Sequence, residues 1–167
     1  MSRPKKQQFS PISGKHKRFS QEAYDRHDAA AVSAVQRHLD EEGEWARPNE
    51  DKYGPDLVIW QGFRPVRYVE VEQRSAWLAG EWPSKWDRVN IPERKLKNWQ
   101  HGLPCDHWII SMDLKSALVI SDYVFRTCGA LEEFSNSVHA SGELFLRVPL
   151  DVCEQYSIGP QGGMAYE

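Results

Sequence analysis

The chain has 167 residues, 40% of them hydrophobic and 27% charged, with a formal net charge of −3; these values describe a single ordinary soluble domain with a core of its own. No apolar run approaches the ~18–20 residues of a membrane span, and no apolar stretch follows the charged N-terminus as in a signal peptide, so we expect no membrane partner. The three cysteines are odd in number and far apart, which argues against a disulfide framework and favours the reducing cytoplasm.

The first segment, residues 1–19, is predicted to be a flexible basic arm. Residues 1–20 contain six basic side chains and no acid, whereas the rest of the chain contains fifteen basic and twenty-four acidic ones. Such an arm can reach the phosphates of a nucleic acid, although a solvated tail without a partner explains the same composition equally well. The candidates for nucleic-acid contacts in the arm are Lys5, Lys6, Lys15, Lys17 and Arg18.

A helix is predicted from Gln21 to about Glu42. Ser20 is a suitable N-cap and Gly43 a suitable C-terminal stop, and apolar side chains recur between them with a modest 3.6-residue period. The helix opens a single domain that we expect to extend over residues 20–158, followed by a flexible C-terminal tail at 159–167.

A short strand near Trp45 and then a two-stranded hairpin are predicted next. "DLVIW", residues 56–60, is a compact apolar strand, and "VRYVEVEQR", residues 66–74, alternates apolar and polar side chains. The connection "QGFRP" between them is short, so the two strands should pair in antiparallel fashion.

The remaining segments are predicted to complete a mixed sheet flanked by helices. A helix is expected over "IPERKLKNWQHG", residues 91–102, with Pro in its first turn and Gly at its end. "DHWIISMD" (106–113) and "SALVISDYVF" (116–125) are expected as strands, and "ELFLRVPL" (143–150) as the last strand. The order helix, strand, hairpin, helix, strand, strand favours an α/β or α+β fold.

Three carboxylates lie on or beside strands that are otherwise apolar. Asp56 follows Pro55 at the start of one strand, while Glu70 and Glu72 share one face of the next strand because side chains alternate. Neighbouring strands can hold an Asp and a Glu a few Å apart. Carboxylates at that distance repel each other, and a hard divalent cation such as Mg²⁺ relieves the repulsion.

The order of "GPD", an apolar strand, a short turn and "VEVE" resembles the motif of the PD-(D/E)XK nuclease superfamily, whose restriction-endonuclease-like fold has an αβββαβ core. The resemblance covers about residues 20–121. Asp56 stands at the position of the motif Asp, Glu70 at the second acid, Val71 at the intervening residue and Glu72 at the Lys.

The resemblance implies that Asp56, Glu70 and the carbonyl of Val71 hold Mg²⁺ or Mn²⁺. The first helix of this superfamily often adds an acid that faces the site. The candidates here are Glu22, Asp25 and Asp28.

The sequence departs from the motif at Glu72, where most members of the superfamily have Lys. Some restriction enzymes of the superfamily with Glu or Gln at this position are active, so the departure does not exclude catalysis. In other branches the Lys comes from the following helix, which offers Arg94, Lys95 and Lys97 here, and Lys95 is our choice. A second register, with Glu72 as the acid and Arg74 as the cation, stays open. We prefer the first register because Val71 can pack in the core.

The acids also have a purely structural explanation. Glu70 and Glu72 would then form a solvated strand face, paired with Arg67, Arg74 or Arg88.

Three tryptophans, Trp77, Trp82 and Trp86, follow the acidic strand and lie beside Lys85 and Arg88 in sequence. Aromatic and cationic side chains together suit base stacking and phosphate contacts, which makes Lys85 and Arg88 candidate nucleic-acid ligands. Most of the tryptophans are nevertheless expected to be core residues.

Cys105 and His107, with His101 nearby, have too few partners for a structural zinc site, which needs four ligands. We therefore expect a buried thiol and a surface histidine.

The function implied by the resemblance is that of a small Mg²⁺-dependent deoxyribonuclease, a phosphodiester hydrolase acting as an endonuclease on DNA. Glu72 would orient the attacking water or help to hold a second ion, and Lys95 would stabilise the charge that builds on the phosphate. A homodimer is compatible with this function. The alternative is a catalytically inactive nuclease-fold protein that binds nucleic acid or a protein partner, as the missing Lys and the acidic body suggest.

Overall fold

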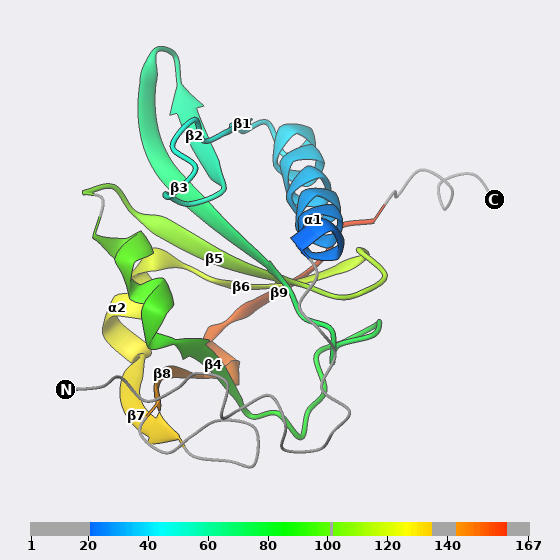
Figure 1. Cartoon of the computed structure of the whole chain (residues 1–167), viewed down its shortest axis with the longest axis vertical. Coiled ribbons are helices and arrows are strands. Elements are labelled where there is room, and N and C mark those ends of the chain that lie inside the picture. The colour runs from blue at the N-terminus through cyan, green and yellow to red at the C-terminus, as the bar shows by residue number, and fades with distance from the viewer. Residues whose placement is uncertain (1–20, 101, 135–142, 160–167) are drawn as a thin grey trace.

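The computed structural model of the chain describes residues 21–100, 102–134 and 143–159. Its elements, in chain order, are α1 (Gln21–Glu41), β1 (Trp45–Pro48), β2 (Leu57–Gln61), β3 (Arg64–Gln73), β4 (Arg88–Pro92), the 3₁₀ helix η2 (Glu93–Trp99), β5 (Cys105–Ile110), β6 (Ser116–Ile120), α2 (Asp122–Cys128), β7 (Ala130–Phe134), β8 (Glu143–Pro149), the 3₁₀ helix η3 (Leu150–Val152) and β9 (Glu154–Ser157). They form a six-stranded sheet in the order β1-β2-β3-β5-β6-β9 and a three-stranded sheet in the order β4-β8-β7 (Figure 1). Within the described part of the chain, no helix has the length and apolar character needed to cross a membrane.

The first predicted helix is confirmed as α1, which ends at Glu41, one residue before the expected end. Gly43 follows with a φ of 86°, a left-handed conformation that glycine adopts without a steric penalty. Ala31, Val35 and Leu39 are buried on the side of α1 that faces the large sheet, which explains why a helix with only a modest apolar period is stable here.

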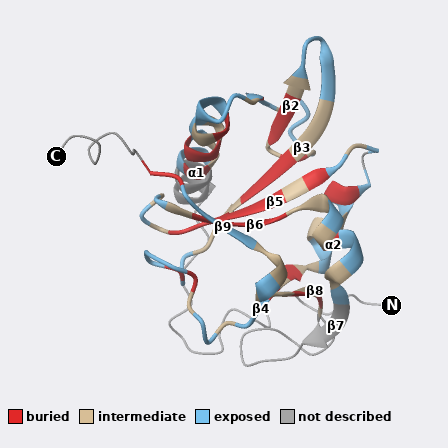
Figure 2. Cartoon of the chain, turned by 180° about the vertical axis from the view of Figure 1, so that it is seen from behind, coloured by how far each residue is buried: buried red, intermediate tan, exposed pale blue. Residues whose placement is uncertain are grey.

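The predicted hairpin is also confirmed, since β2 and β3 pair in antiparallel register. Gly62, in the turn between them, has a φ of 62°. The hairpin extends beyond the rest of the large sheet (Figure 1), and its far end is exposed while the strand segments near the centre of the sheet are buried (Figure 2).

The pairing of β3 with β5 fixes the topology of the large sheet. These two strands are parallel, whereas the other neighbouring pairs of this sheet are antiparallel. A parallel pair needs a crossover connection, and the segment with β4 and η2 supplies it. If β4, which belongs to the three-stranded sheet, is set aside, the succession α1, β1, β2, β3, η2, β5 follows the expected αβββαβ order, with the 3₁₀ helix η2 in the place of the second helix. The expected fold class, a mixed α+β sheet flanked by helices, is confirmed.

Two apolar cores lie on the two faces of the large sheet. Val69 and Val71 of β3 face α1, as the alternation in the sequence predicts. The opposite face, which includes Ile109 and Leu118, packs against side chains from the Trp-rich segment, η2, α2 and the three-stranded sheet. Glu70 and Glu72 belong to this second face because they alternate with Val69 and Val71.

The second core contains elements that the sequence did not predict. β4 was missed because its partner is β8, which lies more than fifty residues later in the chain. The expected helix over 91–102 is the shorter 3₁₀ helix η2, and Pro92 belongs to the end of β4. The expected strand over 116–125 stops at Ile120, because the Ser121 hydroxyl accepts a hydrogen bond from the Val124 N–H and begins α2.

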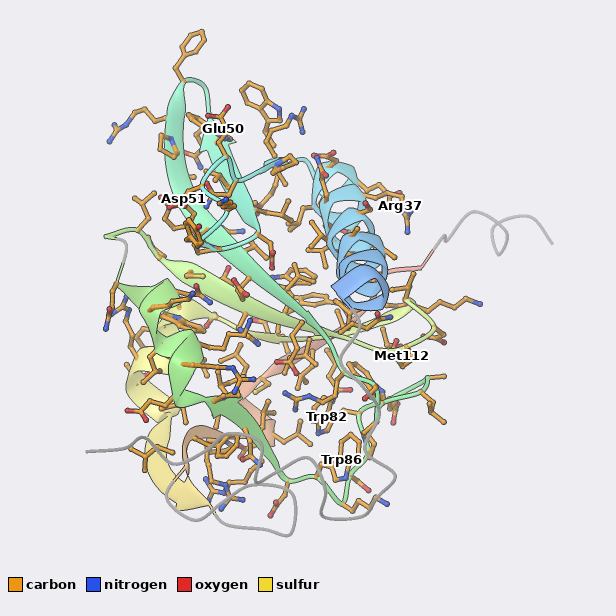
Figure 3. The ribbon with its side chains drawn as sticks, viewed as in Figure 1. Arg37, Glu50, Asp51, Trp82, Trp86 and Met112 are labelled. Atoms are coloured by element: carbon orange, nitrogen blue, oxygen red, sulfur yellow. The ribbon has the colours of Figure 1, made fainter. Side chains whose placement is uncertain are left out.

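Of the two tryptophans labelled in Figure 3, Trp82 is buried and Trp86 half-buried, below the large sheet in that view. Trp77 is also buried, at 1% exposure. The expectation that most of this tryptophan cluster is core is confirmed. β8 is the strand expected over 143–150, but it is not the last one, since β9 follows and pairs with β6.

Candidate active site

Asp56, directly before β2, is held in place by hydrogen bonds across the loop that connects β1 to β2. The Asn49 main-chain N–H donates to the Asp56 carbonyl at 3.0 Å, and the Asn49 side-chain amide donates to the Pro55 carbonyl at 2.9 Å. The Asp56 carboxylate reaches across to β3, where its Oδ2 accepts a hydrogen bond from the Val71 N–H at 2.8 Å. Asp56 is thereby fixed next to the segment of β3 that carries Glu70.

Glu70 is buried, with an exposure of 7%, and its Oε1 lies 3.0 Å from the Lys95 Nζ. Burial raises the pKa of Glu70, and the negative charge of Asp56 raises it further, against the opposing charges of Lys95 and His107. Burial likewise raises the pKa of Asp56, although the Val71 N–H and the charge of Lys95 act against it. Each carboxylate is therefore costly to ionise in this place without added positive charge.

Lys95 comes from η2, whose position is set by Trp99 at its end. The Trp99 ring stacks on Phe125 with centroids 3.5 Å apart and planes at 3°, and the Arg126 guanidinium donates to the Trp99 carbonyl at 2.8 Å. Of the three cations predicted as replacements for the motif Lys, Lys95 is thus the one that the structure brings to Glu70. Arg94 and Lys97 are exposed.

Glu72 has different neighbours, although it shares a strand face with Glu70. Arg74 Nη2 and Nε lie 2.6 and 2.8 Å from Glu72 Oε2, and His107 Nε2 lies 3.2 Å from Oε1. Burial alone would raise the pKa of Glu72, but the His107 hydrogen bond and the charges of Arg74 and His107 together lower it to about 2. The structural explanation of the acids, a strand face paired with arginines, therefore holds for Glu72, which pairs with Arg74. Arg67 pairs with Glu44 and Asp106 instead.

The sequence did not identify His107 as a site residue, and the expectation of a surface histidine is wrong. His107 is fully buried and is the β5 partner of Glu70 in the parallel register. Its Nδ1 has no hydrogen-bond partner within the described part of the chain. The alternation of β5 placed His107 on one face with Cys105, and could have indicated its burial. Cys105 is buried as expected, and burial raises the pKa of its thiol.

The donor set fits a hard divalent cation held by few protein ligands. Asp56 and Glu70 offer carboxylate oxygens whose ionisation is opposed by burial and, for Glu70, by the charge of Asp56. Among the described residues, no group of three or more His, Cys, Asp or Glu side chains is arranged to hold a metal ion. Mg²⁺ needs no such cage, since it commonly binds one or two carboxylates together with water and phosphate oxygens.

The other predicted site residues fall in three places. Lys85 and Arg88 are exposed, and Arg88 lines a separate depression with Asp87 and Asp151, at the end of β4 opposite to η2. The side chains of Glu22, Asp25 and Asp28, at the start of α1, are outside the described part. The basic residues of the arm, Lys5, Lys6, Lys15, Lys17 and Arg18, also lie outside the described residues.

Comparisons with known proteins give one structural likeness. No family model and no curated protein sequence matches the chain. The structure is similar to that of Hjc, a Holliday junction resolvase from Archaeoglobus fulgidus, with a TM-score of 0.45 and 11% sequence identity, over 75% of this chain and 85% of that one. The description of the fold as a mixed sheet flanked by helices rests on the strand order and on the parallel pairing of β3 with β5.

Proposed function

We propose that the chain is a metal-dependent nuclease that hydrolyses phosphodiester bonds in nucleic acid, with DNA as its substrate. The observation that carries this proposal is the contact of Lys95 with Glu70 at 3.0 Å, beside Asp56, on a core of αβββαβ order. Most members of the superfamily have Lys at the position of Glu72. In this proposal Lys95, which belongs to η2, takes the place of that cation.

Asp56, Glu70 and the Val71 carbonyl would hold Mg²⁺ or Mn²⁺, which when bound lowers the pKa of a water molecule and polarises a phosphate oxygen. Lys95 stands where its ammonium group can donate to a phosphate oxygen that gains charge in the transition state. Glu72 has both oxygens engaged by Arg74 and His107, so in this proposal it holds these two side chains in place.

The direct test is cleavage of labelled DNA with and without Mg²⁺ or Mn²⁺ by the full chain and by Asp56→Asn. The Asn side chain can still accept the Val71 N–H but carries no charge. We expect the wild type to cleave only with the divalent ion and the variant to be inactive while folded. A wild type that binds no divalent ion and cleaves neither DNA nor RNA would contradict the proposal.

The role of Lys95 has its own test. Lys95→Ala should lower the turnover number by about 10²-fold, by analogy with the loss of one transition-state donor, while the affinity for Mn²⁺ changes little. Lys97→Ala makes the same charge change at a neighbouring exposed residue of η2 and should keep full turnover. Equal activity of both variants would remove Lys95 from the chemistry.

A second candidate function is favoured by the same contact. The ammonium of Lys95 already places a positive charge on Glu70, as a metal ion would, and so can stabilise this carboxylate in a protein that only binds nucleic acid or a protein partner. Calorimetric titration with Mn²⁺ separates the two functions. The nuclease should bind the ion and lose that binding in Asp56→Asn, whereas the binding protein should show no such heat.

A further inference from the structure

A cavity of about 500 Å³ lies over β1, β2 and the turn of the hairpin that extends beyond the rest of the large sheet (Figure 1). Three aromatic side chains line it, Trp45, Trp60 and Phe63. Phe63 is 98% exposed and Trp45 is 45% exposed, so neither ring is a core residue of the described chain. We call the hollow that these three rings line the aromatic cavity.

The strand register places Trp45 and Trp60 opposite each other. They are partners in the antiparallel pairing of β1 with β2, and such partners have Cβ atoms about 5 Å apart. Within the described part of the chain, neither ring stacks on another ring. The Arg47 guanidinium lies over the Trp45 ring, 5.2 Å from its centroid, and is itself held by Asp40 at 3.5 Å. The two tryptophans therefore flank an open space, and the Trp45 ring has a fixed support.

The aromatic cavity lies on the same face of the large sheet as the acids. Arg47 pairs with Val58, and Val58 pairs with Tyr68. Paired residues share a face, and so do Tyr68 and Glu70, which are two positions apart on β3. The opposite face of β2 packs against α1. A ligand in the cavity and a metal ion at Glu70 would therefore lie on one continuous surface.

The distance along β2 is short on the scale of a nucleic-acid strand. Trp60 lies four positions after Asp56 in the chain, which is about 13 Å at the rise of an extended strand. Successive nucleotides of a stacked strand are about 3.4 Å apart. A strand whose phosphate lies at Asp56 therefore reaches the aromatic cavity within a few nucleotides.

The charges of the lining favour a base over a phosphate. Arg47 and Glu50 are the charged side chains that line the cavity. Arg47 is already paired with Asp40 and donates to the Ala46 carbonyl at 2.6 Å, so the lining has no positive surplus for a phosphate. The base is the flat and uncharged part of a nucleotide, and aromatic side chains bind it by stacking. A base exposes its face in this way where it has left the stack of a duplex.

The edge of the sheet disfavours an added peptide strand as the occupant. β1 is the edge strand beside the cavity, and it is four residues long and ends at Pro48. Proline has no N–H to donate to a further strand, and short edge strands with proline resist such pairing. The aromatic rings, and not the main chain of β1, are thus the part of this surface that is suited to a ligand.

We propose that the aromatic cavity binds an unpaired base of a nucleic-acid strand, with Trp45, Trp60 and Phe63 as the stacking surfaces. The inference rests on the proposed function and names its substrate class. The substrate is a strand with at least one unpaired base within a few nucleotides of the bond that is cut.

The experiment measures the binding of two fluorescent DNA strands to the full chain by anisotropy, in EDTA and at one fixed salt concentration. One strand has bases throughout, and the other is an abasic strand of the same length with the same number of phosphates. Because the two charges are equal, phosphate contacts contribute equally to both affinities. We expect the wild type to bind the strand with bases about tenfold more tightly, as for the stacking of one base on an aromatic side chain.

Trp45→Ala should remove most of this preference for bases, and Trp45→Phe should keep part of it because a smaller ring remains. Phe63→Ala should also lower the preference, at a position so exposed that folding does not depend on it. Tyr123→Ala is the matched control, since Tyr123 is 74% exposed on α2 and outside the cavity lining, and it should keep the preference in full. Thermal unfolding of each variant checks that it is folded.

The proposal is overturned if the wild type binds both strands equally, if Trp45→Ala keeps the preference, or if Tyr123→Ala loses as much of it. Sedimentation equilibrium tests a second copy of the chain as the occupant. A wild-type dimer that Trp45→Ala converts to a monomer, without any preference for bases, would overturn the proposal in favour of a dimer interface.

The result does not depend on cleavage, because EDTA removes divalent ions. A wild type that prefers the strand with bases but never cleaves with Mg²⁺ or Mn²⁺ would reject the nuclease and retain the aromatic cavity. A wild type that cleaves but shows no preference would reject the cavity and retain the nuclease.

Discussion

At the scale of single residues, two glutamates that are two positions apart on β3 have opposite pKa shifts. Burial raises the pKa of both, but Glu70 meets the like charge of Asp56 as well as the charges of Lys95 and His107, whereas Glu72 is hydrogen-bonded to both His107 and Arg74. The neighbours decide the sign of the shift. Glu72 is therefore a carboxylate whose charge is already stabilised by its neighbours, whereas the negative charges of Asp56 and Glu70 would be stabilised by a bound cation.

The lowered pKa of Glu72 predicts a loss of stability in acid. Its pKa falls from 4.5 in the unfolded chain to about 2 in the folded one, so its stabilisation is present above pH 4.5 and disappears as the pH falls toward 2. The difference corresponds to about 3 kcal/mol in the free energy of unfolding. Urea unfolding between pH 5 and 2 should show this fall in the wild type and in Glu70→Gln, but not in Glu72→Gln. A fall of the same size in Glu72→Gln would contradict it.

The raised pKa of Asp56 predicts the opposite sign. Its charged form is disfavoured in the folded state, so the ionised carboxylate lowers stability increasingly as the pH rises through its raised pKa. Asp56→Asn should therefore be as stable as the wild type at pH 7, or more stable. Asp56→Ala also leaves the Val71 N–H without its acceptor, which costs about 1–3 kcal/mol. Denaturant unfolding of both variants at pH 7 measures the difference, and an Asn variant as unstable as the Ala variant would indicate a structural role for the charge.

At the scale of elements, η2 connects the packing of the second core to the site. Trp99 at its end stacks on Phe125 and, with ring centroids 5.8 Å apart, on His107. The same 3₁₀ helix, which is separated from β3 in the chain by β4, brings Lys95 into contact with Glu70. The position of the cation is thus determined by an aromatic side chain one turn later.

Loss of the Trp99 ring should affect both stability and the site. Trp99→Ala is expected to lower the free energy of unfolding by about 3–5 kcal/mol, as for other large-to-small core changes, and to release Lys95 from Glu70. Trp99→Phe keeps an aromatic ring against Phe125 and should lose less than half of that. Chemical denaturation gives the stabilities. Equal stability of the two variants would show that the stack does not hold η2 in place.

At the scale of the whole molecule, the charge is unevenly distributed, with basic first twenty residues and an acidic body. This distribution predicts that the first twenty residues contribute to the binding of phosphates. Removal of residues 1–18 should leave the thermal midpoint of unfolding unchanged, since that stretch has no apolar period to bury. Binding to DNA should weaken, and its salt dependence should flatten by about 0.9 log unit for each phosphate that the arm binds in the full chain. An affinity at low salt that is identical with and without these residues would exclude them from binding.

The sequence by itself determined the features that depend on neighbours in the chain. The 3.6-residue period and Gly43 determined α1, and the short "QGFRP" turn determined the β2–β3 hairpin. The alternation of β3 placed Glu70 and Glu72 on one face and Val71 on the other. These follow from backbone periods and turn chemistry, which act over a few residues. The pairing of Asp56 with β3 follows from the hairpin in the same way.

Only the tertiary structure decided what meets this face of β3. His107 contacts Glu72 across 35 positions of the chain, β4 exists because β8 pairs with it, and η2 is a 3₁₀ helix that ends at the Trp99 stack. Such contacts depend on the packing of the second core. The local apolar pattern of its segments is compatible with more than one arrangement, so the pattern alone does not determine which contacts form. For that reason the sequence could offer Arg94, Lys95 and Lys97, with Lys95 as our choice, while only the packing of η2 brings the Lys95 ammonium group to Glu70.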